Sequence, residues 1–500
     1  MLSRGTRIAV AQTRLAREMG LMGLVATGVC SMVGAGINVI PFMIQRHVPG
    51  IGPHVLLAFV VAAVPAVLAG LAYATLASAM PRAGGSYVYA SRGLDPYLGF
   101  IASFSQWFSL CVAIGVVSYV LVTFLRDIAL AVNAATVAAW LESGPVRVAI
   151  SLACLWAAAA VNLRGVKAYE RLVVPLMFLT FALGAVVIVA GFSFDQADFR
   201  TVMTARGSAV PATPEPQLTL GLLAPASALL FASFIGFDSI AQAGGEAKRP
   251  GRDLPLAIGI AVGSVGLFYL LFTAAVYHAV PWSYIAAEAK TRDLTAPGLL
   301  GVLLPPVWTV IIVSSAAVAL VKDLPAMLLA VSRLMFAWAQ DGIFPSAVAA
   351  VHPTRRTPHV AVLASAGMAT LGVLGSHLAG DFFLGVDILV TSMLVNFMLM
   401  SASVLALPAR NPALAAAVRV LPSRAVQAPL AAAGVIVLAI FLGVHTWRDL
   451  TGPAAAWYFR STPVWALVMA AGTLVYLRER AALVRAGVDL DARFRELPPE

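Results

Sequence analysis

The sequence predicts an all-α integral membrane protein with twelve transmembrane helices, as shown by its composition, its long uncharged stretches and the distribution of its positive charges. The chain has 500 residues, of which 60% are hydrophobic and only 11% are charged, whereas soluble domains carry about a quarter charged residues. Stretches such as 55–80 and 172–194 contain no charged residue. Each can cross a hydrocarbon core about 30 Å thick, which takes about 20 helical residues.

Twelve such apolar stretches follow one another along the chain. Only helices account for them, because backbone polar groups in lipid must be paired within the segment. The connections between them are short, so no separate soluble domain is expected. The spans are expected to begin near Leu21, Val55, Leu98, Val146, Leu172, Leu218, Pro255, Pro306, His359, Phe382, Gln427 and Thr462.

The formal net charge of +10 reflects membrane topology rather than a surface for nucleic acid. If the amino terminus lies in the cytoplasm, most Lys and Arg fall in cytoplasmic segments, as the positive-inside rule requires. We therefore expect a multi-pass protein of the cell membrane with both termini cytoplasmic, in contact with the lipid bilayer and with no nucleic-acid partner. Cys30, Cys111 and Cys154 lie in apolar stretches without a metal or disulfide spacing, and neither a metal nor a cofactor is expected.

Two of the expected spans are weakened at their centres. The first contains "CSMVGAGINVIP" (30–41), with three small residues in succession from Gly34, and the sixth contains "FASFIGFDSIAQAGGE" (231–246), with Gly236 in mid-membrane. Small residues in one membrane helix usually allow close helix packing. Two such helices five spans apart instead indicate a five-plus-five inverted repeat, in which discontinuous helices bind a substrate near the bilayer midplane.

Four stretches in order resemble the amino acid–polyamine–organocation (APC) transporter superfamily. The first is "GAGINVIP" from Gly34, and the second is "YATLASAMPRAGGSYVYASRGLDPYLGF" from Tyr73. The third is "FIGFDSIAQAGGEAKRPGRDLPLAI" from Phe234, and the fourth is "SRLMFAWAQDGIFP" from Ser332. Their order and spacing make the resemblance specific over roughly ten of the spans.

The resemblance implies a permease that moves amino acids or related amines across the membrane by alternating access, and we expect it to be driven by protons or by exchange. It also implies a ten-helix core at 21–408 with inverted repeats of about 21–191 and 218–408, followed by two additional helices at 427–478. The charge distribution adds a cytoplasmic segment at 1–20 and a cytoplasmic tail at 479–500. A transporter of polyamines or another organic cation, and an amino-acid-sensing transceptor, remain as alternatives.

The weakened spans supply the expected substrate contacts. The amino end of a half-helix offers unpaired N–H groups and partial positive charge to a carboxylate, while unpaired carbonyls where a helix stops suit an ammonium. We assign the carboxylate to the first span and the ammonium to the sixth, with the substrate side chain read by neighbouring residues. The predicted substrate-binding residues are Ser31, Val33, Gly34, Ala35, Gly36, Phe231, Ala232, Phe234, Ile235, Gly236 and Phe237. A packing role remains an alternative for each aromatic residue.

Charged residues inside the expected spans are candidates for coupling or gating, because such charges are costly in a bilayer and usually have a partner or a function. Asp238 follows the sixth-span break and is the first candidate, with a structural hydrogen-bond acceptor as the alternative. Lys322 and Asp323 share the eighth span. Adjacent helical residues need not pair, so Lys322 either supplies a fixed cation, pairs with Asp238 or Asp387, or extends its ammonium to water.

The sequence gives no indication of an enzyme. The seven histidines show no paired metal-ligand spacing, and no phosphate-binding glycine loop is present. Charges in the expected inner loops, Arg92, Glu246, Arg333 and Asp341 among them, are either ordinary solvated residues or members of ion pairs that lock a cytoplasmic gate.

Overall fold

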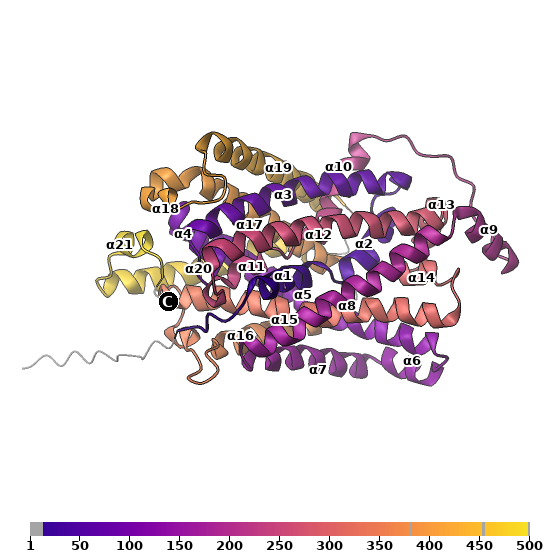
Figure 1. The fold of residues 1–500 in the computed structure, drawn as a ribbon, viewed down its shortest axis with the longest axis horizontal. Coiled ribbons are helices and arrows are strands. Elements are labelled where there is room, and N and C mark those ends of the chain that lie inside the picture. Colours follow the sequence, from indigo (N-terminus) through magenta and orange to yellow (C-terminus); the bar gives the residue numbers. More distant parts are fainter. Residues whose placement is uncertain (1–13, 380–381, 453–455, 499–500) are drawn as a thin grey trace, which may run out of the picture.

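The computed structural model describes residues 14–379, 382–452 and 456–498 as a helical bundle whose long helices run along its longest axis (Figure 1). The described residues form no strand, and two isolated bridges, Met19–Ala247 and Ala83–Ala243, are their only β-type pairings. Both described ends of the chain lie at one end of the bundle, since Pro498 accepts a hydrogen bond from Arg82 and Arg14 accepts one from Arg356. We call this the termini end.

Eleven helical segments of the described chain are long and apolar enough to cross a membrane. In two of them a break divides the helix, giving α1 with α2 and α10 with α11. The segments contain α1 (Leu21–Met32), α2 (Ala35–His47), α3 (Val55–Ala79), α5 (Pro96–Ala131), α7 (Gly144–Leu163), α8 (Val166–Ser193), α10 (Leu220–Leu230), α11 (Ser239–Gln242), α12 (Pro250–Ala279), α15 (Pro306–Gln340), α16 (His359–Ala379), α17 (Phe382–Arg410) and α19 (Arg424–Thr451).

The twelfth expected span corresponds to α20 (Ser461–Arg485), a helix that packs against α5 and α17. It is not among the eleven segments that meet the length and hydropathy requirement for a membrane span. Its carboxyl-terminal part carries Arg478, Glu479, Arg480 and Arg485. The all-helical membrane architecture is therefore confirmed, and eleven of the twelve predicted spans are supported.

Short helices close the two ends of the bundle. At the termini end lie α4 (Gly85–Gly93), α18 (Pro412–Ala416) and α21 (Leu490–Arg495), on the left of Figure 1, and at the opposite end lie α6 (Ala135–Glu142), α9 (Gln196–Ala205), α13 (Trp282–Glu288) and α14 (Ala296–Leu300). The 3-10 turns are η1 (Gly52–His54), η2 (Phe231–Phe234), η3 (Gly244–Glu246), η4 (Ser346–Ala349) and η5 (Trp457–Phe459).

Helix α5 lies in the interior of the bundle and packs against α4, α7, α15, α16, α17 and α20. Its close approach to α16 depends on two glycines, since a Cβ on Gly115 would lie 2.4 Å from the carbonyl carbon of Gly372. Its amino end is capped by Asp95, whose carboxylate accepts from the N–H groups of Tyr97 and Leu98. The centre of the bundle is thus held by close backbone packing, as expected for membrane helices.

One predicted helix start differs from the structure. Helix α8 begins at Val166, whereas the uncharged stretch indicates a start near Leu172. The early charges are accommodated at the helix end, because Lys167 pairs with Glu18 at 3.2 Å. The connection after α8 contains a short helix, α9, which begins with a capping box between Asp195 and Asp198.

Candidate functional site

The first membrane segment is interrupted where the sequence predicts a weak helix. Helix α1 ends at Met32, and α2 begins at Ala35 with Gly34 as its amino-terminal cap. Val33 and Gly34 have non-helical backbone angles, with φ −84° and ψ 83° for Val33 and φ −125° and ψ −143° for Gly34. Carbonyls at the end of α1 and N–H groups at the start of α2 therefore lack helical partners.

The sixth membrane segment is interrupted in the same way. Helix α10 continues into η2 and stops at Phe234, Ile235 is extended, and Gly236 has φ +133° before α11 begins. That φ lies in the region that L-residues other than glycine rarely adopt. Glycine at this position thus permits the break rather than only a close helix contact.

The two breaks touch. A Cβ placed on Gly236 would lie 2.4 Å from the carbonyl oxygen of Ser31, and a Cβ placed on Gly36 would lie 3.8 Å from Ser233 Oγ. Most of the predicted binding residues here are buried, whereas Gly36 and Ala232 are partly exposed. The structure thus brings the predicted contacts of the first and sixth spans together in the middle of the bundle.

Lys322 and Asp323 lie at the first break and pair with each other. The Lys322 ammonium is 3.2 Å from Asp323 Oδ1, and both side chains are buried, at 0% and 5% exposure. Lys322 also donates to the carbonyl of Cys30, at 3.3 Å, and to that of Val33. The lysine thus satisfies carbonyls that the end of α1 leaves without helical partners, which sequence spacing alone did not predict.

The Asp323 carboxylate lies against Gly34, at the amino end of α2. A Cβ on Gly34 would be only 1.8 Å from Asp323 Oδ2, so no other residue fits there unless the aspartate moves. This is where the sequence predicts a substrate carboxylate. In this conformation, a carboxylate of the chain itself occupies the place.

Asp238 is held by hydrogen bonds rather than by a cation. Its carboxylate accepts from the N–H of Gly236, at 3.1 Å, and from the amide of Gln106 on α5. Among the described residues, no Lys, Arg or His lies within ion-pairing distance of it. Gln106 continues the network, because its Oε1 accepts from Ser86 at 2.6 Å and from Asn396 at 3.3 Å. These contacts favour the structural role over the gating role for Asp238.

The aromatic residues of the sixth segment pack against other rings. Phe234 lies between Phe59 and Tyr269, with ring centroids at 5.8 and 6.0 Å. Phe237 stacks on Phe397 at 5.0 Å, and Phe231 meets the edge of that same ring at 6.0 Å. These contacts favour a packing role, while the hydroxyl of Tyr269 donates to Met32 O at 2.5 Å and links the aromatic cluster to the first break.

Two buried ion pairs close the termini end of the bundle. Arg92 on α4 binds Asp341 at 2.5 and 2.9 Å, and Arg333 on α15 binds Glu246 at 2.5 and 3.2 Å. All four side chains are at most 3% exposed. Burial opposes the charged form of Arg92, but the neighbouring Asp341 outweighs it, so the pKa of Arg92 lies above its usual value. Of the two states considered from the sequence, these residues adopt the ion-paired one.

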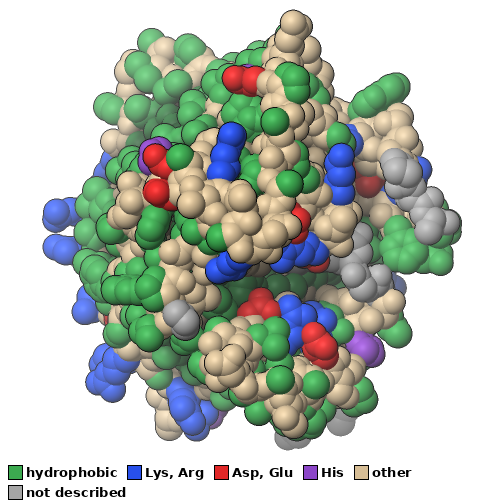
Figure 2. Space-filling model, turned by 90° about the vertical axis from the view of Figure 1, so that its right-hand side faces the viewer, with side chains coloured by type: hydrophobic (Ala, Val, Ile, Leu, Met, Phe, Trp, Pro, Cys, Tyr) green, Lys and Arg blue, Asp and Glu red, His purple; other side chains and the backbone are tan. Residues whose placement is uncertain are grey.

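The opposite end of the bundle is hollowed. A cavity of about 1190 Å³ opens there, lined by parts of α2, α5, α7, α14 and α15, and Figure 2 shows basic and acidic side chains gathered around the central hollow of this face. We call this cavity the vestibule. Its lining includes Val39, one turn of α2 beyond Gly36.

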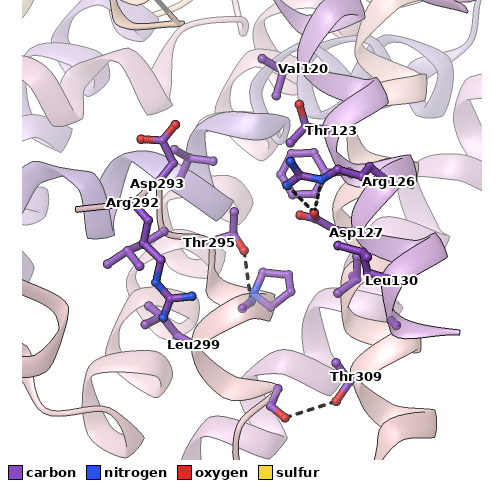
Figure 3. Close-up of a pocket in the computed structure, with 18 of the residues that line it drawn as sticks. Val120, Thr123, Arg126, Asp127, Leu130, Arg292, Asp293, Thr295, Leu299 and Thr309 are labelled. Carbon is purple, nitrogen blue, oxygen red and sulfur yellow. Dashed lines mark hydrogen bonds and ion pairs between the residues drawn. The ribbon is translucent and has the colours of Figure 1, made fainter. Parts of the chain in front are cut away.

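Arginines dominate the charged lining of the vestibule. Figure 3 shows Arg126 and Asp127 on one wall, facing Arg292 and Asp293 on the other. The acidic residues are engaged, since Asp127 pairs with Arg126 at 2.7 Å and Asp293 pairs with Arg46 at 2.9 Å. The lining arginines are Arg46, Arg126, Arg147, Arg206 and Arg292.

Arg147 is distinctive among the vestibule arginines. Its guanidinium lies 3.9 Å from the ring centroid of Tyr119 and donates to Thr123 Oγ1 at 2.7 Å. Within the described part of the chain, it has no carboxylate within ion-pairing distance. The sequence does not single out Arg147, because a charge at the start of a helix is ordinary. It does not single out Gln106 either, because the side chain is uncharged and only ionised residues within spans indicate a coupling role.

Among the described residues, no group of three or more His, Cys, Asp or Glu could hold a metal ion.

Comparisons with known proteins agree on one family. A family model described as amino acid permease matches residues 19–471. A methylthioribose transporter of Bacillus subtilis is 26% identical over 92% of this chain and 93% of its own length. The branched-chain amino acid permease BcaP of Bacillus subtilis is 27% identical over 80% of this chain and 82% of its own. The human cationic amino acid transporter 4 is 26% identical over 74% of this chain and 56% of its own length.

Proposed function

Because the chain belongs to the amino acid permease family, we propose that it is a secondary transporter that carries amino acids across the cell membrane by alternating access. The observation that carries this proposal is the contact between two interrupted helices in mid-bundle, at Gly236 and Ser31. Broken helices that meet near the membrane midplane bind solutes in secondary transporters. We assign the helices of 21–191 and 218–408 to the two inverted repeats and place both termini in the cytoplasm, in accord with the charge distribution.

The conformation is then the outward-facing one. The vestibule reaches Val39 from the end opposite the termini, while the Arg92–Asp341 and Arg333–Glu246 pairs close the termini end. In alternating access, a solute enters through the vestibule and reaches the breaks. The two ion pairs separate when the inner side opens.

Lys322 provides a fixed positive charge at the carbonyls of Cys30 and Val33. A bound metal cation would need the same carbonyl oxygens, which the ammonium already uses. We therefore propose transport without sodium, driven by protons or by exchange, with Lys322 and Asp323 as the coupling groups. Asp238 instead holds the break in the sixth segment through Gly236 and Gln106.

The alternative substrates differ in charge. A polyamine must pass a vestibule lined by five arginines, of which Arg46, Arg126 and Arg292 are paired with carboxylates. The excess of positive charge there is therefore small, and it disfavours a polyamine only weakly. A second candidate is a neutral solute without a carboxylate. It is favoured by the position of Asp323, which fills the place for a carboxylate at Gly34, and by the similarity to a protein named as a methylthioribose transporter.

Uptake by the purified protein in proteoliposomes tests these proposals. The labelled probes are L-leucine, L-arginine, methylthioribose and putrescine, each with and without an inward proton gradient and with sodium or choline outside. Accumulation of an amino acid that ignores sodium supports the proposal, and its loss in Asp238→Asn would restore a coupling role to that residue. Uptake of methylthioribose alone would select the second candidate. Specific binding of an amino acid without any flux would favour the transceptor.

A further inference from the structure

The amino end of α2 has the properties of an anion site, and Asp323 fills it. Helix α2 has 13 residues, and its first turn presents N–H groups without helical partners and partial positive charge. The Asp323 carboxylate lies against Gly34 at this end. The carboxylate comes from α15, which is far from α2 in the sequence, so this is a tertiary contact rather than a local cap.

Lys322 completes the arrangement with a positive charge. Its ammonium binds Asp323 Oδ1 and the carbonyls of Cys30 and Val33. The chain thus places an ammonium at the carboxyl end of α1 and a carboxylate at the amino end of α2. These are the two charged groups of an α-amino acid, supplied here by neighbouring side chains.

Two polar atoms at the contact between the breaks are available to a ligand. Ser31 Oγ and Ser233 Oγ are buried and have no hydrogen-bond partner, although buried hydroxyls normally have one. Both belong to the contact between the breaks, where Ser233 Oγ approaches Gly36. Pro325 follows the pair on α15 and cannot donate a hydrogen bond to the preceding turn, so the backbone that carries Asp323 lacks one helical restraint.

We propose that Asp323 is a built-in competitor for the substrate carboxylate, which binds the amino end of α2 only when Asp323 leaves it. This inference rests on the proposed function and names the group that the substrate must displace. Two carboxylates about 4 Å apart repel by an amount worth about a thousandfold in affinity at an effective dielectric constant of about 20. The substrate carboxylate and Asp323 therefore cannot share the site. Lys322 remains as counter-charge to the incoming carboxylate.

Chemical rescue by acetate tests the competition without knowledge of the substrate. Asp323→Ala removes the carboxylate and leaves a space beside Lys322 and Gly34. Thermal unfolding of this variant in lipid nanodiscs is expected to shift upward with acetate and to saturate. The wild type, in which the place is filled, is expected to bind acetate at least about tenfold more weakly. Acetamide has the same shape without the charge and is expected to have no effect on either protein.

Asp323→Asn is the matched control, because it fills the space without the charge and should not respond to acetate. A folded Asp323→Ala protein that ignores acetate, or an equal response in variant and wild type, would overturn the inference. If Asp323→Ala does not fold, the double variant Lys322→Met/Asp323→Ala takes its place, because it removes both charges and still exposes the amino end of α2. Its thermal shift with acetate is expected to be smaller than with Lys322 present. Absence of any shift in this variant would refute the proposal. Thermal unfolding requires no transport, so the acetate measurement gives a result even if the uptake assay shows no transport of amino acids.

Discussion

The buried pair between Arg333 and Glu246 allows a direct test of the proposal that ion pairs hold the termini end closed. Glu246→Gln preserves the shape of the side chain but removes its charge. In the structure, both partners are 1% exposed, and the guanidinium donates to both carboxylate oxygens, at 2.5 and 3.2 Å. The substitution therefore leaves the arginine buried without a counter-charge in this conformation.

The magnitude follows from the burial. Removing one partner of a buried ion pair costs about 3–5 kcal/mol. If opening of the termini end hydrates Arg333, the inward-facing state is spared most of that cost. Since about 1.4 kcal/mol corresponds to a factor of ten, the equilibrium should move toward the inward-facing state by about a hundredfold or more.

Hydrogen exchange measured by mass spectrometry reports the shift directly. The amides of α4 and of the segment 242–250 lie at the closed end and should exchange at least about a hundredfold faster in Glu246→Gln. The control is Glu18→Gln at the same end, which removes an exposed pair with Lys167 at 3.2 Å. Exposed pairs contribute about 0–1 kcal/mol, so this variant should match the wild type. Equal exchange in Glu246→Gln and Glu18→Gln would refute the gate.

Three further substitutions test other parts of the molecule. Arg147→Gln should raise the KM for a carboxylate solute by about three- to tenfold, and the increase should be larger at low salt than at high salt. Arg147→Lys keeps the charge and should raise the KM less. An unchanged KM in Arg147→Gln would contradict a role in solute capture. Gly236→Ala should lower the free energy of unfolding by denaturant by at least about 2 kcal/mol, because alanine disfavours the positive φ and its Cβ would contact Ser31 O. The control is Gly259→Ala, where a Cβ would meet no atom within 4 Å. It should change the free energy of unfolding by less than about 1 kcal/mol. Asp238→Asn should retain the uptake of the wild type, since an amide oxygen still accepts from Gly236 N–H. Loss of uptake with normal folding would contradict the structural role.

The sequence was sufficient for the features that depend on backbone chemistry and hydropathy. Uncharged length predicts the spans, and glycines at Gly34 and Gly236 predict the breaks because a helix is weak there. The expectation that the breaks belong together was based on their separation by five spans, and the two meet at Ser31 O. The predicted substrate contacts remain untested as contacts with a substrate.

The partners of the charged residues were not predictable in the same way. Lys322 and Asp323 are adjacent on a helix, where side chains diverge, yet they pair because both reach the gap that α1 and α2 leave open. Pairing across the gap depends on tertiary placement, which a single sequence does not reveal. The same holds for Gln106, whose importance comes from its contact with Asp238 rather than from its own residue type.

A binding site that is satisfied by its own charges when empty affects the whole transport cycle. The Lys322–Asp323 pair leaves no exposed charge at the break of α1 and α2 in the absence of solute. A carrier whose empty site is neutral encounters no charge penalty when it returns unloaded across the membrane. We therefore expect that this protein can return without cargo, so that its site allows net uptake as well as exchange.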